Sequence, residues 1–447
     1  MKGGGPGAGP PGPPEAETLA EAEADRLYVR RVRRGYLLVS GFDYFADMLL
    51  TVTSVLLLQS YGMSSGAVFA LVAAVWILEG IAEIPTGILA DMFGRRASVT
   101  VSFALRAGGY GALFFSDSVA VAASGTLLAA LGGTFASGSL EAWAVDETRS
   151  RNPLSLDRLF AQGKIAENAG LVLGTLTGAA LGTLDLAVPQ LAAGSACALA
   201  AVASALLMAG GRHAPRPTGA FGQRLRGSAR EVVTGARYTL QGDRVLIALI
   251  LGAALLWLCR GIPGVQWTVV YDGLVGGHLV VLALMRGVGS LLEIPLLGWT
   301  LGLQKRGAGA RRTVIVTAAS VGAVSLAAAG LIREPAVSIV CYVGFSTAFG
   351  LCMPGVRAAV NERVDGPHRA TVLSVASLFN SLFTGGGLVV TGMAVGDLDS
   401  TAVAWPLAAA AFGAVGLWVA ALTVRAAPAR PSDREAAAAL PQDVSST

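Results

Sequence analysis

Long apolar stretches, each about the length of a bilayer-crossing helix, alternate with short polar connectors along most of the chain. A helix needs about 20 mostly apolar residues to cross the hydrocarbon core of a membrane. The pattern predicts an all-α polytopic membrane protein with twelve transmembrane helices. We expect them at 35–59, 64–88, 97–116, 119–144, 157–183, 188–210, 244–268, 274–301, 312–332, 335–356, 370–396 and 402–424.

Composition supports the membrane assignment. Of the 447 residues, 53% are hydrophobic and 14% are charged, whereas soluble domains carry about 25% charged residues. Mean hydropathy is +0.62. The cysteines fall inside predicted helices without the spacing of metal ligands, so we interpret them as packing residues and expect no metal or cofactor. They are Cys197, Cys259, Cys341 and Cys352.

The positions of the arginines predict how the helices are oriented. Basic residues fill the segment before the first predicted helix and the connectors after every even-numbered one, whereas the alternate connectors carry mainly aspartates. Lysine and arginine concentrate on the cytoplasmic side of membrane proteins, so both termini are expected in the cytoplasm. The +4 net charge follows from this topology, and we expect no nucleic-acid partner. The basic residues include Arg33, Arg34, Arg95, Arg96, Arg149, Arg151, Arg224, Arg226, Lys305, Arg306, Arg363 and Arg369.

The two halves of the chain repeat one another. Glu83-Ile84-Pro85 ends the second predicted helix and Glu293-Ile294-Pro295 lies in the eighth, each before a basic turn. The longest connector separates these halves. The predicted units are a cytoplasmic tail at 1–34, a six-helix bundle at 35–210, a basic cytoplasmic linker at 211–243, a second six-helix bundle at 244–425 and a disordered cytoplasmic tail at 426–447. Within the first tail, 15–34 is expected to form a short polar helix.

Ionisable residues inside the predicted helices are the main candidates for a functional site, because an unpaired charge in the bilayer core is costly. Asp43 and Asp47 lie one turn apart on the first helix, and Glu79 and Glu83 have the same spacing on the second. Since these helices run antiparallel, Asp43 is expected at the depth of Glu83, and Asp47 at the depth of Glu79. Carboxylates that lie close together in a low dielectric bind a proton more readily than isolated ones.

This chemistry suits a proton-coupled carrier, and Asp47 and Glu79 are the first candidates for proton coupling, with Asp43 next. Taken singly, each charged residue has the alternative role of a structural ion pair or helix cap. The further candidates for proton or substrate binding are Arg106, Glu141, Glu167, Arg260 and Arg286. Glu293 completes the set.

A short segment after the second predicted helix carries the most specific pattern, Gly87-x-x-x-Asp91-x-x-Gly94-Arg95-Arg96. It resembles the signature of the major facilitator superfamily between its second and third helices. The resemblance implies two six-helix pseudo-repeats, with the repeats related by an axis along the membrane normal. Together with Glu83-Ile84-Pro85 and with Gly138–Trp143 leading to Asp146, the pattern is similar to bacterial drug and metabolite exporters that work by proton antiport.

The resemblance also implies a cytoplasmic gate. It places Asp91 near the amino end of the eleventh helix, around Arg369, and pairs Arg95 with Asp146, so that the cytoplasmic side stays closed when the carrier faces outward. The alternative is a turn whose solvated charges only set topology. The gate residues predicted in this way are Glu83, Gly87, Asp91, Gly94, Arg95, Arg96 and Asp146.

The fifth predicted helix carries glycines every four residues: Gly170, Gly174, Gly178 and Gly182. Exporters of this type often have a proline after a glycine here, and Thr175 occupies that place. One glycine face favours close helix packing over a specific antiport hinge. Among the aromatic residues, Trp76, Trp143 and Trp257 are expected to line a central cavity or to face lipid. Trp267 and Tyr271 suit an interfacial belt.

No phosphate-binding Gly-x-x-x-x-Gly-Lys-Ser/Thr stretch occurs, so neither ATP-driven transport nor an enzyme is expected. The predicted function is proton-coupled efflux of a small organic molecule, such as a drug, antibiotic or secondary metabolite, by alternating access. Proton-coupled uptake and a transporter-like receptor or lipid-scrambling protein are the alternatives. The expected partners are a small-molecule substrate, protons and membrane lipids. We expect a monomer in a bacterial inner membrane, and the substrate charge stays open.

Overall fold

The protein is built of α-helices in the computed structural model, which describes residues 15–149, 156–208, 221–241, 243–364, 369–395 and 400–425. No strand occurs in this described part. The first helices are α1 (Glu15–Met48), α2 (Ser54–Ser60), α3 (Ser65–Phe93), α4 (Arg95–Phe114), α5 (Val119–Ala136), α6 (Ser139–Arg149), α7 (Leu156–Gly182) and α8 (Val188–Leu207). They are followed by α9 (Phe221–Gln241), α10 (Arg244–Val275), α11 (Leu279–Gln304), α12 (Ala308–Leu331), α13 (Pro335–Asn361), α14 (Arg369–Ala394) and α15 (Thr401–Arg425). The predicted all-α fold class is confirmed.

Two of the predicted membrane helices are each divided by a short break. The segment predicted at 35–59 is split into α1 and α2. Between these helices the backbone forms turns with hydrogen bonds across three residues, such as the one that Leu50 N–H donates to Asp47 O at 3.2 Å. The segment predicted at 119–144 is split into α5 and α6 at Gly138, whose φ is +68°. A glycine adopts this left-handed conformation without steric cost.

Nine helical segments of the described residues are long and apolar enough to cross a bilayer. The helices α1, α4 and α7 fall short of that composition, and they carry Asp43, Arg106 and Glu167. These less apolar helices pack in one group, since α1 lies against both α7 and α8, and α8 also packs on α4. Burial of their charged positions against one another keeps these groups away from lipid, where an unpaired charge is costly.

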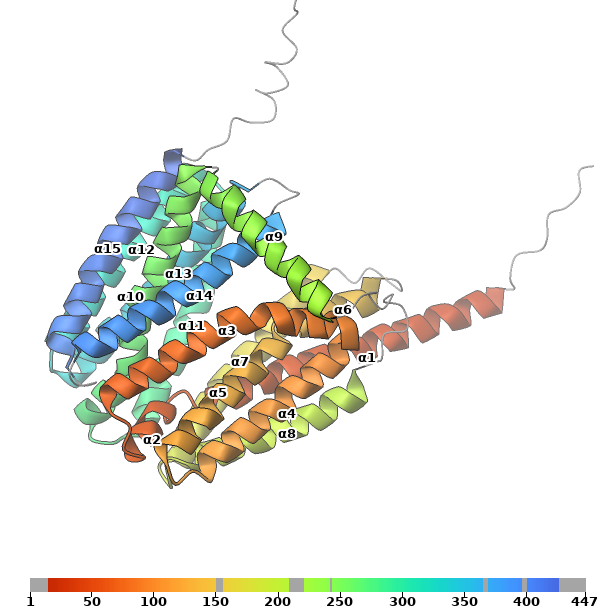
Figure 1. The fold of residues 1–447 in the computed structure, drawn as a ribbon, viewed down its shortest axis with the longest axis horizontal. Helices are drawn as coiled ribbons and strands as arrows, with labels where there is room; N and C mark the ends of the chain where they lie inside the picture. The colour runs from red at the N-terminus through yellow and green to blue at the C-terminus, as the bar shows by residue number, and fades with distance from the viewer. Residues whose placement is uncertain are drawn as a thin grey trace, which may run out of the picture.

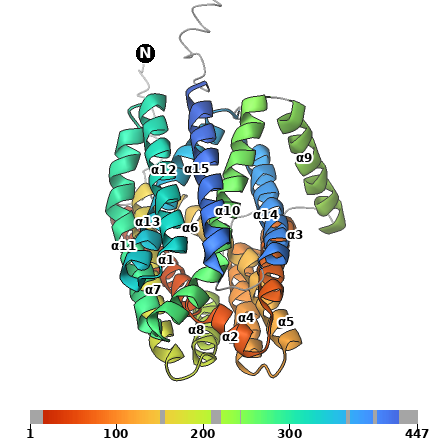
Figure 2. The ribbon, with the colours of Figure 1, turned by 90° about the vertical axis from the view of Figure 1, so that its left-hand side faces the viewer.

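The helices form two bundles in space, α1–α8 on one side and α10–α15 on the other (Figure 1). The bundles contact each other through α3 with α14 and through α7 with α11. In Figure 1 the two bundles approach closely at one end and diverge toward the end that α9 crosses. Figure 2 shows α9 at one end of the molecule and α2 at the other.

Close helix contacts join the bundles at the end far from α9. A Cβ added at Gly392 of α14 would lie 2.5 Å from Phe69 Cβ of α3, and one at Gly182 of α7 would lie 3.0 Å from a Leu279 methyl of α11. At the other end α9 packs on both α14 and α3. Gly87, which lies near that end of α3, has no neighbour within 4 Å of an added Cβ.

The glycine face of α7 packs directly on the backbone of α1. A Cβ added at Gly170, Gly174 or Gly178 would lie 2.3, 2.5 or 2.0 Å from the carbonyl oxygens of successive turns of α1. A backbone cannot move aside as a side chain can, so only glycine fits at these positions. The contact fixes the part of α1 that carries the two aspartates, and it supports the packing interpretation of the glycine pattern.

The tails and the linker differ from the sequence-based expectation in two respects. Residues 15–34 form no separate short helix, because α1 runs without interruption from Glu15 to Met48. The linker at 211–243 contains a helix, α9, which was not predicted. Its Gly235 lies against Thr371 and Val375 of α14. The predicted tail segments 1–14 and 426–447 lie outside the described residues.

Candidate functional site

Arg106 of α4, itself buried, forms an ion triad with the two aspartates of α1, whose side chains are 25% and 48% exposed. The Arg106 side chain is 3% exposed, and its Nη1 and Nη2 atoms donate to Asp43 and Asp47. The Tyr110 hydroxyl, one turn further along α4, donates to Asp47 Oδ1 at 2.9 Å. Two carboxylates thus share one guanidinium, so each charge of the triad has an opposite charge as its hydrogen-bond partner.

The sequence predicted Asp43 at the depth of Glu83 and Asp47 at the depth of Glu79, and it did not predict that both aspartates pair with Arg106. The glutamates of α3 lack such a partner: neither Glu79 nor Glu83 forms an ion pair with another described residue. Both side chains are exposed. Glu79 lies within electrostatic range of Asp47 and of Glu83, so negative charges face it from its own helix and from α1.

The two other acidic candidates of this half form no ion pair with Arg106. Glu167 on α7 is 9% exposed and accepts a hydrogen bond at 2.7 Å from Lys164 Nζ, one turn before it. Glu141 is exposed in the first turn of α6, where a negative charge complements the helix dipole. These positions suit a local ion pair and a helix-terminal charge.

Arg260 of α10 and Arg286 of α11 line a polar cavity in the other bundle. The cavity has a volume of about 170 Å³. Tyr342 and Ser346 of α13 add hydroxyl groups to its wall, and Thr51 contributes from the break between α1 and α2. Within the described residues no carboxylate lies at ion-pair distance from either guanidinium.

The positions of the charged groups in and near this cavity depend on two glycines, Gly264 in its wall and Gly350 on α13. Arg260 Nη1 lies 3.0 Å from the place that a Cβ of Gly264 would occupy, so the guanidinium folds over the next turn of α10. Glu293, two turns after Arg286 on α11, acts electrostatically on both arginines. Its carboxylate nevertheless packs against Gly350 of α13, and Glu293 Oε1 lies 2.2 Å from the place that a Cβ of Gly350 would occupy.

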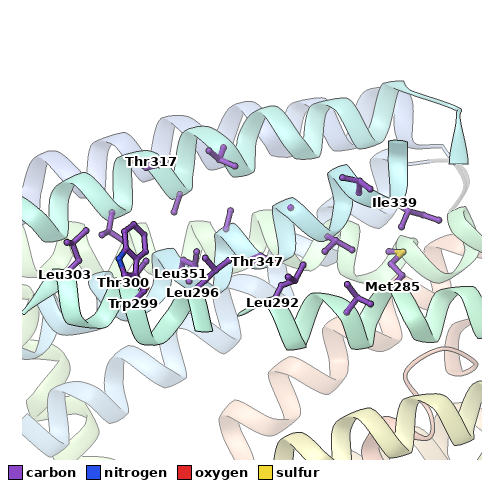
Figure 3. A pocket seen from close by; sticks show the side chains of 18 of the residues that line it. Met285, Leu292, Leu296, Trp299, Thr300, Leu303, Thr317, Ile339, Thr347 and Leu351 are labelled. Atoms are coloured by element: carbon purple, nitrogen blue, oxygen red, sulfur yellow. The ribbon is translucent and has the colours of Figure 1, made fainter. Parts of the chain in front are cut away.

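A larger and almost entirely apolar cavity of about 750 Å³ lies between α11, α12 and α13. Figure 3 shows Trp299 and Leu303 toward one end of it and Met285 and Ile339 toward the other. Met285 also lines the polar cavity, so its side chain belongs to the wall between the two. Much of the lining, such as Trp299, is exposed, as expected for a helix surface that faces hydrocarbon.

Aromatic side chains connect the bundles near the middle of the molecule. Trp76 of α3 packs on Trp257 of α10 with ring centroids 5.7 Å apart, and Trp257 packs on Phe349 of α13 at 5.0 Å. Trp143 instead lies in the amino-terminal core, 3% exposed. The interfacial belt predicted for Trp267 and Tyr271 is wrong.

Trp267 and Tyr271 are buried, and both pack on Tyr342. The Tyr271 hydroxyl donates to Ser338 O at 3.0 Å. Because the Tyr271 hydroxyl has this buried hydrogen-bond partner, the ring does not need to lie at a membrane–water boundary, where the hydroxyl would bond to water.

The predicted gate residues cluster at the divergent end of the first bundle. Arg95 Nε donates to Asp146 Oδ2 at 3.2 Å, as the resemblance implied, and Arg95 Nη2 lies 3.4 Å from Asp91 Oδ1. Gly94 has a φ of +95°, a conformation that requires glycine and turns the chain from α3 into α4. The Arg369 side chain lies outside the described residues. The contact that the structure gives for Asp91 is the one with Arg95, within the same bundle.

The neighbouring Arg96 donates to the Ala205 carbonyl of α8. This contact ties the start of α4 to the end of α8. The ends of α3, α6 and α8 and the start of α4 are therefore held together as one unit at this end of the bundle.

The second bundle has a comparable ion pair that the sequence pattern did not reveal. Arg311, in the first turns of α12, donates to both carboxylate oxygens of Glu362 at 2.7 and 2.5 Å. The repeat placed the basic turn of this half at Lys305 and Arg306, just before Arg311. The available signal was the position of Glu362, which matches that of Glu147 in the first half.

Sequence reasoning also missed three polar residues that complete the two charged sites, namely Tyr110, Tyr342 and Ser346. Helical spacing was the available signal, since residues four apart share a face. Tyr110 follows Arg106 by four residues, and Ser346 follows Tyr342 by four.

Comparisons with known proteins agree with this architecture. A model of the Major Facilitator Superfamily matches residues 36–389. The chain is similar in structure to the nucleoside transporter NupG, with 12% identity and a TM-score of 0.69 over 88% of this chain and 98% of that one. The peptide transporter POT gives 15% identity and a TM-score of 0.70 over 88% and 94%. A D-xylose-proton symporter gives 14% identity and a TM-score of 0.68 over 90% and 98%. No curated protein gives a significant sequence match.

Proposed function

The chain belongs to the major facilitator superfamily and is a multi-pass membrane transporter, and from this premise we propose that it couples the movement of a small organic molecule to protons by alternating access. The observation that carries the proposal is the set of charged side chains inside two bundles that meet at one end and diverge at the other (Figure 1). In transporters built from such repeats, substrate and ions bind near the midplane at the interface of the repeats.

Glu79 is the proposed proton-binding group. A carboxyl group that alternates between its charged and neutral forms needs a site without a permanently paired cation, because such a cation favours the charged form. Glu79 forms no ion pair among the described residues. Asp47 contributes negative charge nearby, which favours proton binding at Glu79. Asp43 and Asp47, which Arg106 holds in the triad, then respond to the change of charge at Glu79.

The basic connectors place the divergent end in the cytoplasm by the positive-inside rule. Both termini are cytoplasmic in this proposal, and the structure corresponds to the inward-facing state. The Arg95–Asp146 pair and Asp91 belong to a cytoplasmic gate that is open here. On closure, Asp91 would approach the amino end of α14, where a carboxylate complements the helix dipole.

Export is the proposed direction, because the motif at 87–96 with Glu83 and Asp146 resembles proton-antiporting exporters. The substrate is proposed to be a drug-like compound or metabolite, the protein to act as a monomer, and the membrane to be a bacterial inner membrane. Uptake is the second candidate, because the fold is shared with a protein named as a D-xylose-proton symporter. The two directions require opposite signs of coupling between protons and substrate.

Purified protein in vesicles with an imposed pH gradient and an internal pH dye tests the proposal. Compounds that the protein transports should move protons across the membrane, opposite to the substrate for export and with it for uptake. Glu79→Gln should abolish this proton movement, whereas Asp117→Asn, in the exposed connector between α4 and α5, serves as the control and should retain it. Gradient-driven transport that survives Glu79→Gln at full rate would overturn the proton site.

The receptor and lipid-scrambling alternatives make a different prediction in the same vesicles. A scrambling protein would move fluorescent phospholipids between leaflets without any gradient. Lipid movement together with a lack of proton-coupled flux for every compound tested would overturn the transport proposal.

A further inference from the structure

We propose that the substrate is a small organic anion whose carboxylate binds between Arg260 and Arg286, an assignment of substrate class that rests on the proposed transport function. Both guanidiniums line one polar cavity, Arg260 from the middle of α10 and Arg286 from a position about two turns after the start of α11. They repel each other, and no carboxylate of the described residues lies at ion-pair distance from either.

Charge balance around the cavity favours an anion. An unneutralised charge inside a membrane protein is costly, and intramembrane charges usually pair or mark a substrate pathway. Glu293 is the acidic group that acts on both arginines, and it offsets one of their two positive charges. A bound carboxylate would supply the missing negative charge.

The chemistry of the wall fits a carboxylate with an apolar or aromatic body. Arginine presents a planar fork that binds a carboxylate through two parallel hydrogen bonds. Tyr342 and Ser346 provide hydroxyl groups, and Trp267 provides an aromatic face. The volume of about 170 Å³ is close to that of a cavity of ~150 Å³ that admits a benzene-sized molecule.

The position of the cavity connects binding with the change of state. Thr51, at the break between α1 and α2, lines the cavity together with residues of α10, α11 and α13. An anion held there would touch both bundles. Its binding would therefore change their relative free energies in the two states, as a ligand must in order to shift an alternating-access equilibrium.

Benzoate and benzamide provide a matched pair of probes, since they share size and ring but differ in charge. Thermal unfolding of the purified full-length chain in detergent is followed at constant ionic strength with rising probe concentration. Benzoate should raise the unfolding midpoint of the protein, because a ligand that binds only the folded state stabilises it. Benzamide should not.

Arg260→Gln and Arg286→Gln should each raise the half-saturating benzoate concentration roughly 10- to 100-fold, the loss expected for a charged hydrogen bond. Arg286→Lys, which keeps the charge but loses the fork, should fall between Arg286→Gln and the unsubstituted protein. Arg333→Gln is the control, because Arg333 is exposed in the connector between α12 and α13. It should leave benzoate stabilisation unchanged.

Equal stabilisation by benzamide, or benzoate stabilisation that survives both glutamine variants, would overturn the anion site. The measurement uses no gradient, so such a result would leave the proton-coupling proposal in place. Conversely, a protein that binds benzoate through Arg260 and Arg286 yet moves no compound in response to any gradient would retain the site and overturn the transport function.

Discussion

The arginines inside the two bundles differ in how their charge is balanced. In the first bundle Arg106 is 3% exposed and pairs with Asp43 and Asp47. In the second bundle Arg260 and Arg286 lie at one cavity without a carboxylate at ion-pair distance among the described residues. The two halves of the repeat thus both contain arginines inside their bundles, but only the first half pairs its arginine with carboxylates.

This difference suggests a division of roles. The first bundle neutralises its own arginine and leaves a glutamate, Glu79, free of a fixed cation, which suits reversible proton binding. The second bundle keeps excess positive charge, which suits an anionic ligand. Substitutions in the two bundles should therefore have opposite effects on stability and on coupling.

The largest effect is expected from removal of the paired arginine. Arg106→Gln leaves Asp43 and Asp47 without a cation. Loss of one partner of a buried pair costs about 3–5 kcal/mol, and the lower end of this range is expected here because the two aspartates are 25% and 48% exposed. Arg286→Gln should leave the stability of the ligand-free protein unchanged or raise it, because it removes one of two repelling charges. Thermal unfolding in detergent without ligand measures both.

A second readout separates the triad from general damage to the fold. The double variant Arg106→Gln with Asp43→Asn should recover part of the lost stability, since it removes one of the stranded charges. Equal destabilisation by Arg106→Gln and Arg286→Gln would contradict the difference between the two bundles.

The contact that fixes α1 should also be more sensitive than a contact in the second bundle. Gly178→Ala would place a Cβ 2.0 Å from Leu49 O, where backbone must move, and overpacking of this kind costs about 1–3 kcal/mol. Gly322→Ala meets the Phe412 ring at 2.6 Å, and a ring can shift more readily. Gly133→Ala on α5, with nothing within 4 Å, is the control.

Unfolding midpoints of these three variants should therefore rank Gly178→Ala lowest and Gly133→Ala highest. A Gly178→Ala protein as stable as Gly133→Ala would show that α1 and α7 are not closely packed in the membrane.

The smallest effects are expected at the ion pairs of the divergent end. Arg311 donates two hydrogen bonds to Glu362 and its side chain is 10% exposed, so Arg311→Gln should cost about 1–2 kcal/mol. Arg95 and Asp146 are 33% and 58% exposed, so Arg95→Gln should cost at most about 1 kcal/mol. The role of Arg95 should be visible in transport rate more than in stability. A larger loss of stability for Arg95→Gln than for Arg311→Gln would contradict this ranking.

The architecture could be predicted from sequence because it depends on local signals. Apolar length and the positions of arginines predicted the order of the helices, and the motif around Asp91 predicted the family. The glycines of α7 predicted close packing because their spacing follows the helical period. Each of these signals lies within one helix or one turn.

The sites were harder to predict because they depend on contacts between helices that are distant in sequence. Arg106 lies 63 residues from Asp43, and no periodicity shows that α4 faces α1. The sequence correctly selected Arg106, Asp43 and Asp47 as charged positions within helices, but it did not show that both aspartates pair with Arg106. Tyr271 was misplaced for the same reason, since its hydrogen bond to Ser338 links α10 with α13.

The division of roles between the bundles is tested most directly by comparing exchange with net transport in vesicles, using an organic acid that the unsubstituted protein transports. Exchange of labelled for unlabelled substrate needs no net proton movement, whereas accumulation driven by a pH gradient does. Glu79→Gln should lose gradient-driven accumulation by at least tenfold and retain exchange, because the substrate site is intact. Arg286→Gln should lose both. Loss of both activities in Glu79→Gln, or retention of exchange in Arg286→Gln, would contradict the account.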